Sequence, residues 1–443
     1  MKAGQRGSGA AGQVRSAFMG LAALVLAGAG APVSAQNAAT PHGPVASPDT
    51  TLTVYLMTMG PGKHVWERFG HNAIWIHDPV HGTDQTYNYG LFDFRQHNFL
   101  LRFIQGRMWY WMEGFPAQSY VESYRRNNRS VWIQELEIAP EKRRELQAFL
   151  EWNEQPEHRF YHYDYYLDNC STRVRDALDR ALDGRLRAAT VNVTTPRTFR
   201  FHTQRLTAND PPVFTGLLLA LGHPVDRPIT AWQEMFLPLA MREWVRTVRV
   251  SGTDGHERPL VRSERTLFQA SEPTPPAQPP IWLWRYLAAG IGLAALLVAL
   301  APGAATPSLA RWAFLLIVWI WCLVSGVAGL VLAGLWGLTD HAAAYNNENV
   351  LQADLLSLLL IWFVTRLAFG RGTHARAALI LAAVIAGISL LGCALKLLPQ
   401  FYQTNGEVIA LALPAHLGVL AGIYRLDATQ DSRSRASASP AAG

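Results

Sequence analysis

Five long apolar stretches near the C-terminus constrain the fold of this chain more than any other feature of its sequence. They cover roughly residues 281–300, 312–336, 353–369, 377–398 and 407–424. A helix needs about 20 apolar residues to cross a bilayer, and most of the five reach that length, the third being the shortest. The sequence therefore predicts an all-α transmembrane domain of five helices over residues 281–425, followed by a disordered cytoplasmic tail over 426–443.

The basic residues around these stretches predict which side of the membrane each loop occupies. Loops that carry arginine usually face the cytoplasm. Here they lie before the second stretch, between the third and fourth, and after the fifth, at Arg311, Arg366, Arg371, Arg376, Arg425, Arg433 and Arg435. Segments 337–352 and 399–407 contain no Lys or Arg. The first helix is thus expected to enter from the periplasm.

The N-terminal 35 residues have the parts of a secretory signal in a bacterial style. A positive start precedes the short apolar core "AFMGLAALVLAGAGA", and "VSA" before Gln36 fits cleavage. An uncleaved anchor helix is the alternative. Residues 36–50 are predicted to be a linker, 51–270 a periplasmic domain, and 271–280, "SEPTPPAQPP", a Pro-rich linker.

The formal net charge of +6 adds little about partners. No Lys/Arg cluster forms a nucleic-acid motif, so we attribute the charge to the membrane and expect no nucleic-acid partner. The predicted location is the bacterial inner membrane, crossed several times.

One cysteine of the three, Cys170, lies in the predicted periplasmic domain, where it has no partner for a disulfide. It precedes "STRVRDALDRAL", in which Val174, Leu178 and Leu182 have helical spacing. The N–H groups of a first helical turn lower a thiol pKa and can stabilise an oxyanion. Cys170 is therefore predicted to be a nucleophile, and an inert buried cysteine is the alternative.

A base for this thiol is predicted on a β-hairpin. His71 opens "HNAIWI", and a turn near residues 80–82 leads into "QTYNYG". Residues equidistant from the turn face each other, so His71 should lie near Gly90, on the same face as Asn88. Asn88 could orient the imidazole, with Asp93 as the alternative. No HExxH motif or paired-cysteine spacing is present, so neither a metal site nor a cofactor is predicted.

Four segments of the chain resemble the Lnb N-terminal periplasmic domain family. They are "RFGHNAIWI", "YNYGLFDF", "NF…FIQGRMWY" and "YYLDNCSTRVRDAL". The resemblance implies an α+β, circularly permuted papain-like (NlpC-type) domain followed by a multi-span membrane region. It also implies transfer of a fatty acyl group from a phospholipid to the N-terminal lipidated cysteine of lipoproteins. A cysteine peptidase or amidase acting on cell-wall peptide, and a non-catalytic membrane scaffold, are the alternatives.

The loop "TDHAAAYNNENV" between the second and third apolar stretches also resembles a family segment. Asp340, His341 and Glu348 are predicted to lie in it at the periplasmic membrane surface. The loop is expected to meet the thiol domain, where His341 or Glu348 would hold or deprotonate the acceptor amine. A solvated connector is the alternative.

Overall fold

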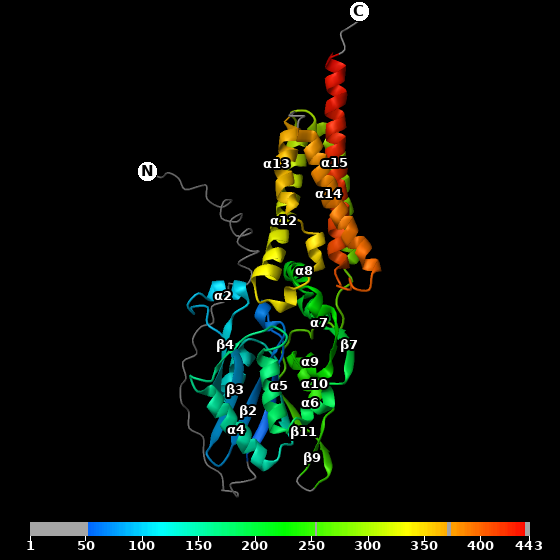
Figure 1. Cartoon of the computed structure of the whole chain (residues 1–443). Coiled ribbons are helices and arrows are strands. Elements are labelled where there is room, and N and C mark those ends of the chain that lie inside the picture. The colour runs from blue at the N-terminus through cyan, green and yellow to red at the C-terminus, as the bar shows by residue number, and fades with distance from the viewer. Residues whose placement is uncertain (1–51, 253–254, 370–373, 439–443) are drawn as a thin grey trace, which may run out of the picture. The chain divides into compact units, whose positions relative to one another are not determined.

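The computed structural model describes residues 52–252, 255–369 and 374–438, so the predicted signal and the linker over 36–50 lie outside the described residues. The chain forms two compact units (Figure 1). The sheet unit contains the described residues up to Leu100, Trp109–Thr190 and Glu234–Pro273. The helical unit contains Leu101–Met108, Val191–Gln233 and the chain from Thr274. Two segments of the predicted domain 51–270 therefore belong with the membrane helices.

The sheet unit is an α+β fold around a seven-stranded antiparallel sheet of order β11-β5-β1-β2-β3-β4-β6. Its strands are β1 (Thr53–Met59), β2 (His71–Asp78), β3 (Thr83–Leu91), β4 (Trp109–Pro116), β5 (Val131–Leu136), β6 (Phe160–His162) and β11 (Val261–Phe268), with a separate pair β9 (Arg249–Ser251) and β10 (Glu257–Pro259). Its helices are η1 (Val65–Glu67), α3 (Ala117–Arg126), α4 (Pro140–Glu154), α5 (Cys170–Ala181), α6 (Arg185–Thr190) and α10 (Pro238–Val245). Two short helices, α2 (Phe99–Gln105) and α9 (Ala231–Glu234), include residues of both units.

The two faces of this sheet are covered by different helices. Successive side chains of a strand point to opposite faces. On one face Ala73 and its β1 neighbours pack against Tyr120 of α3. On the other face α5 packs against β2 and β3, and α4 packs against α5. The β2–β3 hairpin pairs Ile74 with Tyr87 and Asp78 with Thr83. This register agrees with the turn near residues 80–82 that the sequence predicts.

The helical unit contains five helices that are long and apolar enough to cross a membrane. They are α11 (Leu283–Ala304), α12 (Leu309–Leu338), α13 (Leu356–Ala368), α14 (Ala375–Ala394) and α15 (Gly406–Ala438). The third span is completed by η4 (Glu348–Leu351), which gives the apolar segment Glu348–Ala368. The remaining elements are β7 (Thr194–Thr198), α7 (Phe199–Thr207), α8 (Pro211–Ala220), η2 (His223–Asp226), β8 (Pro228–Thr230), η3 (Ala342–Ala344) and η6 (Leu395–Leu397). The predicted five-helix transmembrane fold is confirmed.

Arginine-bearing segments gather at one end of the bundle. Arg425 of α15 donates to the Val298 carbonyl of α11 at 3.1 Å, and Arg311 of α12 donates to the Ala304 carbonyl at 3.0 Å. The segments that carry Arg311 and Arg425 thus both lie beside the C-terminal part of α11. The predicted disordered tail is wrong for residues 426–438, which continue α15. No glycine or proline lies between Gly422 and Pro440 to end the helix.

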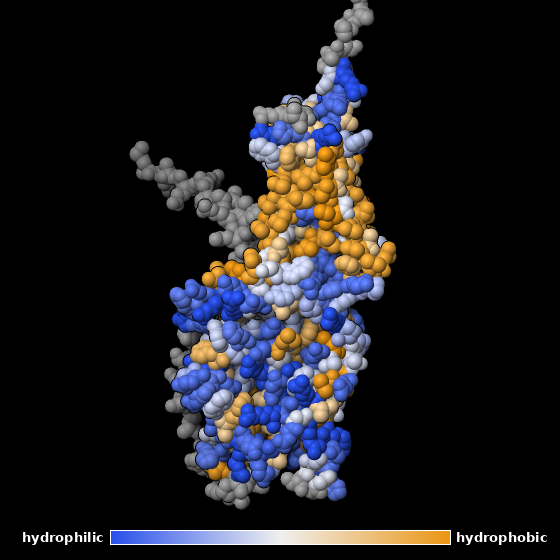
Figure 2. Space-filling view, viewed as in Figure 1, coloured by the Kyte–Doolittle hydropathy of each residue, from blue (hydrophilic) through white to orange (hydrophobic). Residues whose placement is uncertain are grey.

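The bundle presents an apolar belt between two polar ends (Figure 2). Inside it, α11 and α15 approach closely because two glycines lack side chains. A Cβ on Gly290 would lie 2.6 Å from the Leu411 carbonyl oxygen, and one on Gly418 would lie 2.3 Å from Ala294 Cα. Small residues at helix contacts let backbones approach where the surrounding lipid offers no hydrophobic driving force.

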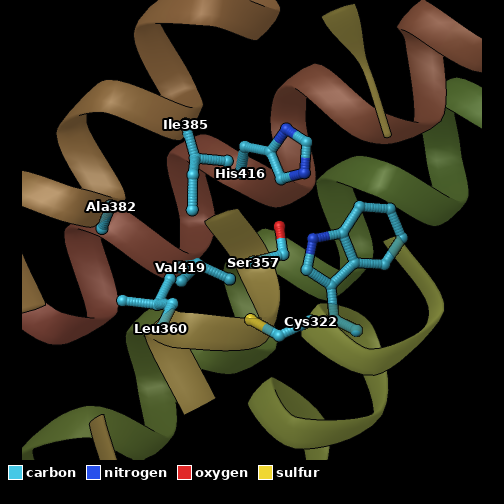
Figure 3. A pocket seen from close by; sticks show the side chains of 8 residues that line it. Cys322, Ser357, Leu360, Ala382, Ile385, His416 and Val419 are labelled. Carbon is cyan, nitrogen blue, oxygen red and sulfur yellow. The ribbon is translucent and has the colours of Figure 1, made fainter. Parts of the chain in front are cut away.

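A small cavity inside the bundle contains polar groups without partners (Figure 3). Trp321, Cys322, Ser357 and His416 line it together with aliphatic side chains. The His416 side chain is buried, and neither of its ring nitrogens hydrogen-bonds to any residue that the structure describes. The Ser357 hydroxyl lies 3.5 Å from that of Ser325. The cavity thus brings polar side chains into a bundle interior that is otherwise apolar.

Candidate functional site

Cys170 occupies the first position of α5, as the sequence predicts. Asn169 caps this helix: its side-chain oxygen accepts from the N–H groups of Ser171 and Thr172 at 2.9 and 3.0 Å. The Thr172 hydroxyl accepts in turn from the Asn169 N–H at 2.7 Å. This reciprocal cap fixes the start of the helix. Cys170 is half-buried and forms no disulfide.

His71 opens β2, and Asn88 of β3 bonds to its imidazole. The Asn88 side-chain oxygen accepts from His71 Nε2. Because a carbonyl oxygen can only accept, Nε2 carries the proton and Nδ1 keeps its lone pair. The ring also stacks on Tyr124 of α3, with ring centres 6.5 Å apart. His71 therefore has one basic nitrogen and a fixed orientation.

Cys170 and His71 both lie next to Gly90. A Cβ at this position would lie 3.1 Å from Cys170 Cβ and 3.6 Å from His71 Cε1. Its φ of 99° is also one that L-residues with a side chain rarely adopt. Only glycine fits here without strain, and Cys170 and His71 both border the space that it leaves.

A second pair of side chains joins α5 to β2 directly behind the dyad. The Ser171 hydroxyl lies 2.8 Å from the Asn72 side-chain oxygen and 2.7 Å from the Met235 carbonyl. The Asn72 amide nitrogen donates to the Thr58 hydroxyl at 2.9 Å. Asn72 and Ser171 are fully buried. They follow His71 and Cys170 in the chain, so their bond holds the two reactive residues in register.

Burial dominates the electrostatics of this pair. It raises the pKa of Cys170 to about 11, although N–H groups of Asn72 and Ser171 and the charge of Arg129 act in the other direction. It lowers the pKa of His71 to about 4 against the bond from Asn88. The lowered thiol pKa expected from the helix start is therefore wrong for the resting site. At neutral pH the pair is a thiol and a neutral imidazole.

Tyrosines and one buried arginine surround the thiol. Burial, and next the nearby sulfur of Cys170, raise the pKa of Tyr110, Tyr161 and Tyr163 above the usual range. The buried Tyr161 hydroxyl hydrogen-bonds to no residue that the structure describes. Arg129 lies over the Tyr124 ring at 4.6 Å and donates to the Gly60 carbonyl at 3.0 Å. Cys170 thus has several tyrosines and the positive charge of Arg129 near it.

Comparison with known proteins assigns the part of the chain that carries this site. Residues 46–205 match the family model described as the Lnb N-terminal periplasmic domain. The match agrees with the resemblance that the sequence motifs show. No curated protein and no solved structure matches the chain. With the five apolar helices, the assignment describes a multi-pass membrane protein with a Lnb N-terminal periplasmic domain.

Of the two predicted orienting residues in the Lnb domain, the structure places Asn88 on His71 and Asp93 elsewhere. Asp93 accepts from the Arg95 backbone N–H at 2.8 Å and pairs with the Arg95 guanidinium at 3.1 Å. It shapes the exposed turn after β3. The bond to His71 follows from the hairpin register, which the sequence could predict, whereas the turn partner of Asp93 could not be predicted.

The three predicted acceptor-site residues lie in the helical unit and are bound to protein. The Asp340 carboxylate pairs with Arg107 at 2.6 Å, and His341 Nε2 donates to the Phe103 carbonyl at 2.9 Å. Glu348 is buried, binds the Lys396 ammonium, and accepts from the Gln403 N–H at 3.1 Å.

The asparagines on either side of Glu348 are buried as well. Asn347 and Asn349 donate to carbonyls at the C-terminal end of α8, Leu218, Leu219 and Ala220, at 2.9–3.1 Å. These contacts exclude the solvated connector and favour an anchoring role for the loop.

No group of three or more His, Cys, Asp or Glu side chains that could hold a metal ion occurs among the described residues. The residues that sequence reasoning missed are Asn72, Ser171, Arg129 and Tyr161. The first two directly follow His71 and Cys170, and this adjacency is the one sequence signal that pointed to them. Arg129 and Tyr161 reach the site only through the fold.

Proposed function

We propose that this protein is a membrane-anchored acyltransferase with a cysteine nucleophile. It would move a fatty acyl group from a phospholipid through a Cys170 thioester to an amine, in a bacterial inner membrane. The acceptor expected for a Lnb domain is the N-terminal lipidated cysteine of a lipoprotein. The observation that carries the proposal is the arrangement of three residues: Asn88 bonds to His71 Nε2, and Cys170 and His71 both lie against Gly90.

In the first half-reaction the Cys170 sulfur attacks the ester carbonyl carbon of the lipid. The thiol proton passes to His71 Nδ1 as the S–C bond forms. The C–O bond then breaks, and the imidazolium returns the proton to the departing glycerol oxygen. The products are a thioester on Cys170 and a lysophospholipid with a free hydroxyl.

In the second half-reaction the acceptor amine attacks the thioester carbonyl. An N–C bond forms, the amine proton passes to His71, and the C–S bond breaks as the sulfur takes that proton back. The enzyme returns to thiol and neutral imidazole. Because donor and acceptor are both lipid-anchored, a catalyst joined to five membrane spans meets each of them on one surface.

The site offers hydrogen-bond donors for the oxyanion that both steps create. N–H groups of Asn72, Cys170 and Ser171 bond toward the sulfur. The Tyr161 hydroxyl is a further donor in the same pocket wall. One such donor is worth on the order of 10²-fold in rate. Tyr161→Phe removes only that oxygen and should slow acylation, and an unchanged rate rejects this role.

Mass spectrometry of the purified full-length protein tests the proposal. After incubation with phospholipid vesicles, Cys170 should carry an acyl group that hydroxylamine removes, and Cys170→Ser should carry no such thioester. Addition of a lipidated peptide amine should discharge the adduct as an amide. Cleavage of cell-wall peptide without any acyl adduct would identify a hydrolase instead, and an unmodified thiol under all conditions would identify a scaffold.

A further inference from the structure

The segment Leu101–Met108 of the helical unit contains two large apolar side chains that are more than half exposed. Leu101 and Ile104 are 52% and 53% exposed, and both belong to α2. Figure 2 shows apolar surface gathered over α2 as well as over the bundle. Two large aliphatic side chains on so short a helix need a covering surface, since a water-facing helix would carry polar residues there.

Hydrogen bonds tie this segment to the end of a membrane span. Asp340, two residues beyond the end of α12, donates its N–H to the Gln105 carbonyl at 2.8 Å. The Arg107–Asp340 ion pair and the His341–Phe103 hydrogen bond add two more links. Gly106 packs so closely here that a Cβ would lie 2.9 Å from the His341 nitrogen. The segment therefore lies at the level where α12 ends.

The length of α12 allows its end to reach the lipid head-group layer. From Arg311 to Leu338, α12 is about 40 Å long at 1.5 Å per residue, close to the ~40–45 Å of a bilayer with its head groups. Leu338 and Trp336 are 82% and 44% exposed, so the apolar surface of α12 continues to its last turn. An exposed tryptophan near a helix end favours the interface between hydrocarbon and water.

We propose that Leu101 and Ile104 insert into the periplasmic face of the bilayer that α12 crosses, making α2 an interfacial membrane contact. Arg102 lies between the two apolar residues in the chain and supplies a basic group of the kind that binds lipid phosphates. The segment leads directly into β4, whose Tyr110 has a pKa that responds to Cys170.

Spin labelling of the full-length chain in nanodiscs of phosphatidylethanolamine and phosphatidylglycerol tests the contact. The label is attached at Ile104→Cys, with Cys170→Ser and Cys393→Ser as background. Val80→Cys is the matched control, because Val80 is an exposed aliphatic residue in the β2–β3 turn. The Ile104 label should collide mainly with oxygen, which dissolves in lipid, and the Val80 label mainly with a water-soluble nickel chelate.

Equal collision of the two labels with the nickel chelate would overturn the proposal. Protection of the Ile104 label from both reagents would also overturn it, since protein from a second copy or from residues 1–51 would then cover α2. Neither readout needs catalysis, so this test stands even if the acyltransferase proposal fails.

A kinetic test rests on the proposed function. Leu101→Asp with Ile104→Asp should raise KM for phospholipid in vesicles about tenfold, because two half-exposed aliphatic contacts are lost. The same variant should deacylate a soluble short-chain ester at the unaltered rate, and Val80→Asp should change neither substrate. An unchanged vesicle KM contradicts the lipid contact, whereas absence of turnover in the unmodified protein contradicts the enzyme instead.

Discussion

Two polar clusters in this protein differ in whether their ionisable groups carry charge. In the sheet unit, Cys170 and His71 are partly buried and neutral, and burial shifts the pKa of each toward its neutral form. In the helical unit, Glu348 is buried as well, but Lys396 neutralises it and Gln403 donates to it. A buried charge must be paired, whereas a buried neutral group can stay reactive. The difference separates the proposed catalytic site from a cluster whose charged group is held in an ion pair.

The largest expected difference concerns the cysteines. Cys170→Ser should lower acyl transfer by at least about a thousandfold, with folding and membrane insertion retained because the change is nearly isosteric. Cys393→Ser, in α14, should transfer acyl groups at the normal rate. The acyl-adduct yield measures both. Normal turnover of Cys170→Ser would show that Cys170 is not the nucleophile, and the two clusters would then no longer differ in function.

The two histidines sharpen the comparison further. His71→Ala should slow acylation by about a thousandfold, since the general base is lost. Asn88→Ala should cost less, because Asn88 only orients the ring. His341→Ala should form and discharge the thioester at nearly the normal rate, because His341 binds the Phe103 carbonyl. Single-turnover rates of the two half-reactions decide this, and slow discharge alone in His341→Ala would restore an acceptor role for that residue.

Glu348 should matter for stability and not for the chemical step. Glu348→Ala leaves the Lys396 ammonium without its counter-charge and should lower the free energy of unfolding by about 2–3 kcal/mol. The double variant with Lys396→Met should recover most of that loss. Asp93→Asn, in an exposed pair, is the control and should leave the unfolding midpoint in detergent unchanged. A stable Glu348→Ala with impaired acyl transfer would reverse the assignment.

Gly90→Ala probes the approach of the thiol to the imidazole. The added Cβ meets Cys170 Cβ at 3.1 Å and must adopt a φ of 99°. Backbone strain of this kind costs about 1–3 kcal/mol, and acylation should slow by about tenfold or more. Gly82→Ala, which meets no atom within 4 Å, tests positive φ without the clash. Equal rates for both variants would show that the Gly90 contact does not control the dyad.

The smallest expected effect is in the pH profile. Because the His71 pKa is about 4, acylation should hold from neutral pH to about pH 5 and fall with a midpoint near 4. The stabilising contribution of neutral His71 is complete above about pH 6.5 and is lost as pH falls toward 4. The stabilising contribution of the neutral Cys170 thiol is complete below pH 9 and is lost as pH rises toward 11. If the acylation rate instead fell with a midpoint near pH 6.5, the His71 imidazole would be hydrated and its pKa would not be lowered by burial.

Much of the fold follows from local sequence. The boundaries between the two compact units do not. Apolar length alone predicts the five spans, and the turn near residues 80–82 alone predicts the hairpin register that sets Asn88 beside His71. The helical unit nevertheless recruits Leu101–Met108 and Val191–Gln233. Those segments join it through contacts to residues far away in the chain, such as Asn347 with the end of α8. No local pattern encodes such partners.

The sequence by itself determined which residues could react: a cysteine at a helix start, a histidine at a strand start and an asparagine in register with it. Those are properties of spacing along one or two adjacent elements. Only the tertiary structure decided their charge state and the role of the loop around Glu348. Desolvation and ion pairing depend on every atom packed around a group, and here burial outweighs the helix N–H groups at Cys170, while Lys396 neutralises Glu348.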